Sequence, residues 1–497
     1  MAVAPACPVD GLHARVVGKL PDWLRGSVYR NGPGMFEGAH AVFDGCAMLV
    51  RFEVDGPSNR VVLSHRFLES TYYKAVKANG TIKWRMAHPP DAPRSALQGL
   101  AYAGGIALGA LQYGRHLGDN AVVSILPQGN ELIAHTETVS GTFRIHPETL
   151  ETLGRVHYRD GIHGLVKTAH QTQLPSGDWV GLAADFSPTL EPGSPQLAMP
   201  EITVFRQSPW RADRRQKIAA VPYMHPTRPT WIHEIPVSEN YAVVVQNPLL
   251  YNVRALLMGQ TADFMAFDWR PELGSMLHLV PLDGGKVKTY RAPAFLAAHW
   301  VNAFESADGR QLHLDAIAAQ SPALMSQWEL DRVRAGPDSS CQVEPSRLCR
   351  LSLDLGLPDG SFLGQKPLLR PLAEEAAFGY GLELPAINPG NRCRPYRYAY
   401  AACCVRPTNV YNALCKVDTH TGEVKTWHEP GGATWEPFFA PRPGGRSEDD
   451  GVVLSTVMQP DGRSALLVLD ARSWQEVARA VLPYALPSGF HGCFVPS

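Results

Sequence analysis

The stretches AMLVRFEV (47–54) and RVVLSHRF (60–67) decide the fold class of this sequence. Each has the length of a β-strand, is rich in β-branched or alternating apolar residues, and is bordered by turn residues. Further runs of the same kind are NYAVVVQN (240–247), GVVLSTVM (451–458) and SALLVLDA (464–471). Helical periodicity is limited to about 94–118, 248–262 and 316–335. The pattern predicts an all-β chain with helical insertions.

The length of the chain narrows this prediction. With 497 residues, 44 of them Gly and 42 Pro, the chain is too long for a single β-sandwich and contains no convincing linker. A β-propeller is the natural closed arrangement for so many strands, and seven blades would take about 71 residues each. No known blade repeat is visible, so we expect divergent blades in a single domain over 1–497.

Composition excludes several classes of function. The formal net charge is −1, and no basic stripe is present, so the chain has no field that would hold nucleic acid. The nine scattered cysteines form neither a disulfide framework nor a CxxC zinc motif, which favours a reducing compartment. No apolar run is long enough to span a bilayer. The first residues show neither a secretory signal nor a complete transit peptide.

Four of the 18 histidines stand out by their surroundings. They are flanked by small or apolar residues, as on buried strands, and are His170, His233, His299 and His491. Any one alone is as well explained by a hydrogen-bonded core histidine. Their separations are 63, 66 and 192 residues, and the last is close to three times the others. One such residue per blade would bring the four imidazoles to the propeller axis. His65, beside polar and charged residues, is expected at the surface.

Four neutral imidazoles predict a metal ion but do not name it, because iron, copper, zinc and nickel all accept this ligand. Their outer N–H groups need carboxylate acceptors that also balance the charge of the metal. The acids embedded in apolar sequence are Glu137, Glu383 and Glu436. The alternative for each is a structural ion pair with Arg or Lys.

Several ordered segments resemble the carotenoid cleavage oxygenase family over nearly the whole chain. They include LPDWLRGSVYRNGPG (20–34), HTETVSGTFRIHPETLETLG (135–154), WIHEIPVSENYAVV (231–244), HWVNAFE (299–305) and FHGCFVP (490–496). The resemblance implies a seven-bladed propeller under a helical dome and Fe(II) held by His170, His233, His299 and His491. It also implies supporting roles for Glu137, Glu383 and Glu436, and places Thr136 beside an open coordination position. Gln171 and Trp300 depart from the family pattern next to two ligands, and His163 and His225 are additional histidines.

Within the family, RPYRYAYAACCVRPTNVYNALCKVD (394–418) and KTWHEPGGATWEPFFAPRP (425–443) are most similar to the plant-type carotenoid cleavage dioxygenase 8 (carlactone synthase) branch of strigolactone biosynthesis. This resemblance implies oxidative cleavage of an apocarotenoid C=C bond by O2 and residence in plastids. Because such a substrate lies in membranes, we expect an apolar patch near Leu249–Leu257, including Leu250 and Leu256, to contact a bilayer. We expect a monomer.

Three alternatives remain from the sequence. The same fold and iron could cleave a full-length carotenoid or a stilbenoid. The chain could be a related metal-dependent isomerase-hydrolase. It could also be a propeller that binds a partner and keeps a metal site without catalysis, although that case predicts lost ligands and none is missing.

Overall fold

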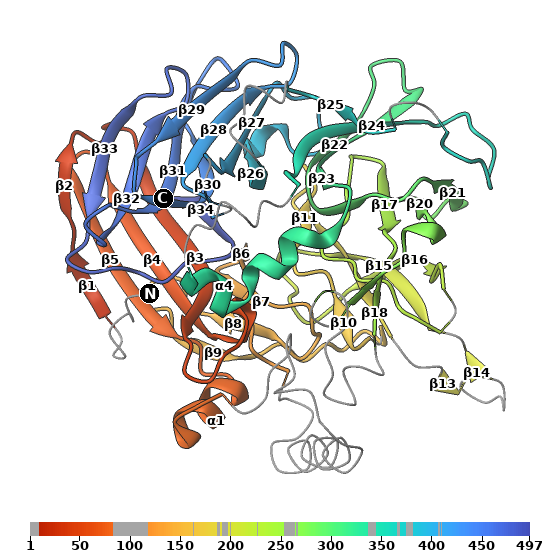
Figure 1. The fold of residues 1–497 in the computed structure, drawn as a ribbon, viewed down its shortest axis with the longest axis horizontal. Helices are drawn as coiled ribbons and strands as arrows, with labels where there is room; N and C mark the ends of the chain where they lie inside the picture. Colours follow the sequence, from red (N-terminus) through yellow and green to blue (C-terminus); the bar gives the residue numbers. More distant parts are fainter. Residues whose placement is uncertain are drawn as a thin grey trace.

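Seven antiparallel sheets surround a common centre in the computed structural model (Figure 1). The structure describes residues 9–82, 118–162, 164–185, 189–190, 197–198, 200–225, 227–252, 264, 267–335, 344–364, 368–373, 381–405, 408 and 410–497. The predicted all-β fold, a seven-bladed β-propeller, is confirmed.

The blades are named here in the order in which the chain forms them. Blade 1 consists of β1 (Val9–His13), β5 (Arg60–Phe67), β4 (Cys46–Asp55), β3 (Arg25–Met35) and β34 (Gly492–Pro496). Blade 2 consists of β6 (Ser124–Gln128), β7 (Glu131–His135), β8 (Thr142–Ile145) and β9 (Thr152–Arg155). Blade 3 consists of β10 (Val166–Lys167), β11 (Thr172–Gln173), β12 (Trp179–Ala184), β15 (Glu201–Gln207) and β16 (Gln216–Pro222).

Blades 4 to 7 follow with the same antiparallel order. Blade 4 consists of β17 (Tyr241–Gln246), β20 (Ser275–Pro281) and β21 (Lys288–Ala292), and blade 5 of β22 (Leu296–Glu305), β23 (Gln311–Ala319), β24 (Arg347–Asp354) and β25 (Arg370–Pro371). Blade 6 consists of β26 (Leu382–Ile387), β27 (Tyr398–Cys403), β28 (Ala413–Asp418) and β29 (Val424–His428). Blade 7 consists of β30 (Ala433–Pro441), β31 (Gly451–Met458), β32 (Ser464–Asp470), β33 (Glu476–Val481) and β2 (Arg15–Gly18).

Burial along the strands explains why these sequences form blades. In β5 every second side chain is buried, because one face of this outer strand packs on the core. In β31 almost every side chain is buried, because its blade is covered by a neighbour on each face. Val453 and Leu454 of β31 are both fully buried and point to opposite faces. Each buried aliphatic side chain contributes about 1.5–3 kcal/mol by leaving water.

Both ends of the chain close the ring. The N-terminal strand β2 is the outer strand of blade 7, where Val16 pairs with Ala480. The C-terminal strand β34 is the inner strand of blade 1, where Phe494 pairs with Val28. Each end of the described chain therefore completes a blade whose other strands come from the opposite end, which ties the first and last blades together.

Helices are few among the described residues. They are α1 (Thr71–Asn79) and α4 (Leu330–Ala335), with 3₁₀ turns η1 (Val42–Asp44), η3 (Pro271–Leu273), η4 (Pro322–Trp328) and η6 (Pro389–Asn391). The predicted helical insertion at 316–335 is right only from 322 onward, because 316–319 belong to β23. The insertion at 94–118 lies outside the described residues except for its last position.

The predicted helix and apolar patch at 248–262 are wrong at their beginning. Leu249 and Leu250 belong to the short strand β18 (Leu249–Tyr251), which pairs with β19 (Phe267–Trp269). Both leucines are fully buried, and Leu249 packs with Ala41 and Leu296, so neither can reach a bilayer. Leu256 and Leu257 lie outside the described residues. Within the part of the chain described, no helix is long and apolar enough to cross a membrane.

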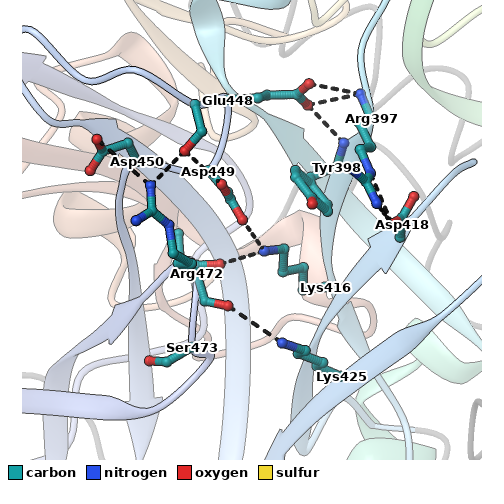
Figure 2. Close-up of polar contacts among 12 residues, drawn as sticks. Arg397, Tyr398, Lys416, Asp418, Lys425, Glu448, Asp449, Asp450, Arg472 and Ser473 are labelled. Carbon is teal, nitrogen blue, oxygen red and sulfur yellow. Dashed lines mark hydrogen bonds and ion pairs between the residues drawn. The ribbon is translucent and has the colours of Figure 1, made fainter.

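A buried ionic cluster joins blades 6 and 7 (Figure 2). The ammonium of Lys416 donates to Asp449 and to the carbonyl oxygen of Ala471, both at 2.7 Å, and lies 4.0 Å from the ring centre of Tyr398. Beside it, the guanidinium of Arg397 donates to Asp418 at 2.7 and 2.9 Å. The cluster therefore holds the loop between β30 and β31 against β28.

One expectation about surface histidines is wrong. His65 is buried on β5, and its Nε2 lies 3.2 Å from the hydroxyl of Tyr484. Burial lowers the pKa of His65 to about 4. Its polar neighbours in sequence face the other side of the strand, because side chains alternate along β5.

Candidate metal centre

Seven side chains, one from each blade, meet on the propeller axis. The inner ends of blades 3, 4, 5 and 1 supply, in turn, His170, His233, His299 and His491. The other three blades, 6, 7 and 2, supply carboxylates in the same layer, from Glu383, Glu436 and Glu137. The separation of 192 residues between the last two histidines therefore spans three blades, as its length predicted.

The four imidazoles are close enough to share one cation. One nitrogen from each ring lies within 4.8 Å of the others, and the Nε2 atoms of His299 and His491 are 3.3 Å apart. Two imidazole nitrogens bound to one ion at about 2.1 Å lie at most about 4.2 Å apart, so a small inward movement is enough. The Nε2 of His170 is buried without a partner among the described groups, as expected for a ligand atom facing the centre.

Three of the imidazoles are held from behind by carboxylates. The Nδ1 of His233 lies 2.6 Å from Glu137, that of His299 2.5 Å from Glu383, and that of His491 2.8 Å from Glu436. A carboxylate accepts only, so the proton is on Nδ1 and the Nε2 lone pair points to the axis. Each of the three acids therefore contacts one imidazole, and no glutamate among the described residues contacts His170.

Charge at the centre fits a divalent cation. Burial, and then the neighbouring imidazoles, lower the pKa values of His170 and His491 well below the usual range, so both are neutral. Burial alone would lower the pKa of His299, but Glu383 raises it to about 9 in the metal-free protein. Burial raises the pKa of Glu436 to about 8. A bound cation would displace the proton of His299 and keep the carboxylates charged.

Irregular backbone aims three of these side chains. The ladder between β22 and β23 shifts register on both sides of His299, the β26–β27 ladder shifts after Glu383, and the β30–β31 ladder shifts across Glu436. Such bulges turn a side chain out of the regular alternation and are common beside active sites. Leu384 has φ 55°, and its N–H donates to Glu383 at 3.0 Å, so a strained residue locks that carboxylate.

A cavity of about 290 Å³ opens onto three of the four histidines, His233, His299 and His491. Its walls are mainly apolar and aromatic, and their rings come from Phe43, Trp231, Tyr251, Phe267, Trp328, Tyr411 and Phe490. Thr136 is buried and lines this cavity. Its place beside an open coordination position stays a prediction. The cavity would seat an elongated apolar molecule with its middle at the metal.

The departures from the family pattern lie away from the cavity. Trp300 is buried in the blade core with Tyr290 and Ala316 and is absent from the described lining. Gln171 is absent from that lining as well, and its amide nitrogen is buried without a described partner. His225 bonds locally to Thr227 rather than to the centre, and His163 lies outside the described residues.

Two residues of the centre escaped the sequence reasoning. Glu234 accepts the backbone N–H of Trp300 at 2.8 Å, tying the segment after ligand His233 to the segment after ligand His299. Burial raises the pKa of Glu234 to about 7. Its apolar flanks, IHEIP, carry the same signal that singled out the other acids. Trp231 stands two residues before His233, the spacing of side chains that share a strand face.

Comparisons with known proteins agree with this geometry. The model of the family described as retinal pigment epithelial membrane protein (RPE65) matches residues 2–496. Carotenoid cleavage dioxygenase 8 homolog A, chloroplastic, from Oryza sativa subsp. japonica is 37% identical over 494 residues, covering 97% of this chain and 85% of the relative. Carotenoid cleavage dioxygenase 8, chloroplastic, from Arabidopsis thaliana is 34% identical over 496 residues, covering 97% and 83%.

Solved structures share the fold at lower identity. A variant of Synechocystis apocarotenoid oxygenase superposes with a TM-score of 0.78 at 23% identity, covering 99% of this chain and 97% of that chain. The lignostilbene dioxygenase of Pseudomonas brassicacearum gives 0.76 at 20% identity, covering 99% and 96%. With the family model matching nearly every residue, the chain belongs to the RPE65/carotenoid cleavage oxygenase family.

Proposed function

We propose that this protein is an iron(II)-dependent dioxygenase that cleaves a C=C bond of an apocarotenoid into two carbonyl products. The observation that carries the proposal is the meeting of two features: four converging imidazoles, and an apolar, aromatic cavity lined by three of them. The names of the rice and Arabidopsis relatives, both carotenoid cleavage dioxygenases 8, support the substrate class.

We assign the metal ligands to His170, His233, His299 and His491. Imidazole suits Fe(II), and the three carboxylates behind the rings match the need of a divalent ion for charge balance. Bound Fe(II) would supply a site where dioxygen is activated. Glu137, Glu383 and Glu436 orient imidazoles through Nδ1 and need not move a proton in the reaction.

The cavity walls position the substrate. Among the aromatic rings of the lining, Phe43 and Phe490 stack at 4.9 Å. Trp231 and Phe267, also in the lining, lie 5.6 Å apart. A polyene held among these rings would present one double bond to the metal and exclude water from it. The alkene supplies the electrons, and the two oxygen atoms of O2 end in the two carbonyl groups.

The test is reconstitution of metal-free protein with Fe(II) under anaerobic conditions, followed by exposure to air and a C27 apocarotenal. We expect O2-dependent shorter carbonyl products by liquid chromatography and mass spectrometry, and none from His299→Ala. A rearranged product with three oxygen atoms would assign carlactone-type chemistry. No turnover by protein with a full complement of iron would overturn the apocarotenoid assignment and direct the search to intact carotenoids and stilbenoids.

We extend the proposal to location and assembly. The plant relatives are named chloroplastic, which supports residence in a plastid. An apolar substrate must be taken from a membrane, so contact with a bilayer stays a prediction, without Leu249 and Leu250. Co-sedimentation of the protein with liposomes, compared with a Leu256→Asp variant, tests that contact. Size-exclusion chromatography with light scattering tests the predicted monomer.

A further inference from the structure

The three carboxylates behind the histidines do not have equivalent second donors. Besides its imidazole, Glu383 accepts the backbone N–H of Leu384 at 3.0 Å, and Glu436 accepts that of Gly492 at 2.7 Å. For Glu137 the second donor is a side chain, because the indole Nε1–H of Trp231 lies 3.0 Å from both carboxylate oxygens. The donor that anchors Glu137, the indole of Trp231, can therefore be changed by mutation or by contact with a ligand.

Glu137 also has the most need of this anchor. Its side chain is 26% exposed, against 11% for Glu383 and 11% for Glu436. An exposed carboxylate held by the imidazole alone could turn toward water and leave the Nδ1 of His233 without its acceptor. Trp231 prevents this by donating to both oxygens at once, which fixes the plane of the carboxylate.

The ring of Trp231 has a second role in the cavity. It lines the wall together with Tyr251 and Phe267, and lies 5.3 Å from the ring of His233 at an angle of 32°. A substrate that packs against this wall touches the residue that sets the orientation of Glu137. Leu384 lines the same cavity, but it anchors Glu383 through its backbone N–H. Among the described contacts of the three carboxylates, that of Trp231 is the one in which a side chain of the cavity wall is the donor.

We propose that Trp231 is a positioning residue that couples occupation of the substrate cavity to the geometry of the metal ligand His233. The part that concerns substrate rests on the proposed function, and the part that concerns metal does not. Because coupling between two ligands is reciprocal, a polyene that holds Trp231 in place raises the affinity for metal, and metal raises the affinity for the polyene by the same factor.

The variant Trp231→Phe tests the metal part, because it keeps an aromatic wall and removes the N–H donor. The matched control is Trp328→Phe, which removes another indole from the cavity lining and has no described contact with Glu137. We expect the affinity of metal-free protein for Co(II), followed by visible absorption, to fall about 10–100-fold in Trp231→Phe, the usual cost of losing an outer partner of a ligand. In Trp328→Phe it should change less than about 2-fold. Equal affinities in the two variants would overturn the proposal.

A second measurement keeps the test valid if Trp231→Phe loses stability. In a Glu137→Ala background, Trp231→Phe should cost no further Co(II) affinity, since its effect passes through the missing carboxylate. Additive losses would show that Trp231 acts by another route. Thermal unfolding of the metal-free variants separates loss of metal affinity from loss of fold.

The substrate part is tested by titrating an apocarotenal into metal-free and Co(II)-loaded protein and following quenching of tryptophan fluorescence. We expect tighter binding in the loaded wild type and equal binding in the two states of Trp231→Phe. Equal binding in both states of the wild type would overturn the coupling. If wild type binds no apocarotenal in either state, the proposed substrate is wrong, while the Co(II) result still decides the role of Trp231 at the metal.

Discussion

The metal centre and the ionic cluster between blades 6 and 7 are both buried groups of charged side chains, but they are built in opposite ways. The ammonium of Lys416 donates to two acceptors within the protein and lies against the ring of Tyr398 (Figure 2). At the centre, three of the four outer nitrogens contact carboxylates, while the inner nitrogens converge on one another. Closed hydrogen bonding marks a structural cluster, and converging open lone pairs mark a binding site.

The largest expected effect separates stability from metal binding. Lys416→Met leaves the carboxylate of Asp449 buried without its cation, so the free energy of unfolding should fall by about 3–5 kcal/mol. Co(II) affinity should stay within about 2-fold of wild type, since the cluster does not touch the histidines. Adding Asp449→Leu should recover most of the stability. Chemical denaturation measures the free energy of unfolding, and Co(II) titration measures the metal affinity. A large loss of metal affinity in a folded Lys416→Met protein would contradict the separation of the structural cluster from the metal site.

His65 with Tyr484 is a second buried polar group whose hydrogen bond lies within the protein, and the dependence of stability on pH should reveal it. Its pKa is about 4 in the folded protein and near 6.5 when unfolded. A depressed histidine pKa means that the unfolded state takes up the proton first, so stability is full above pH 6.5 and falls as the pH drops toward 4. The loss should reach about 3 kcal/mol.

The control for this pH effect is His65→Gln, which keeps a polar partner for Tyr484 and does not titrate in this range. Its free energy of unfolding should depend less steeply on pH between 6.5 and 4. Metal affinity at pH 7 should be that of wild type. Identical pH profiles for the two proteins would mean that His65 is not kept neutral by the fold.

Adding metal should stabilise the folded protein through the four histidines and not through the ionic cluster around Lys416. At a free Fe(II) concentration of 100 times Kd, binding to the folded state alone should add about 2.7 kcal/mol to the free energy of unfolding. The same increment should appear in Lys416→Met, and His299→Ala should show none. Anaerobic calorimetry of the three proteins measures it. A full increment in His299→Ala would place the metal elsewhere.

The smallest effect concerns the carboxylates. Glu436→Gln should lower Fe(II) affinity or turnover about 10–100-fold, because the amide is a weaker acceptor for the Nδ1–H of His491. The metal-free variant should be about as stable as wild type, since the amide has the size of the carboxyl group and still accepts from the Nδ1–H of His491. Iron content and rate are the measurements. Unchanged values for both would remove Glu436 from the metal centre.

Much of the fold and of the site could be predicted from the sequence, because the spacing of apolar residues along a strand shows which side chains are buried. The runs at 60–67 and 451–458 coincide with β5 and β31. The spacing of the histidines followed from one equivalent position per blade. The helix predicted at 248–262 began with a strand, because Leu249 and Leu250 fit a helical face and a buried strand equally well. His65 was misplaced because its neighbours in sequence lie on the opposite face of β5.

The sequence by itself determined the strand-rich architecture, the four histidines and the three acids, because each depends on local pattern and on repeat length. Only the tertiary structure decided which acid holds which imidazole, which bulges aim them, and that Trp231 donates to Glu137 across 94 residues of chain. Those pairings depend on how neighbouring blades are rotated about a common axis. That rotation is the sum of packing contacts spread over the whole ring, which no single segment encodes.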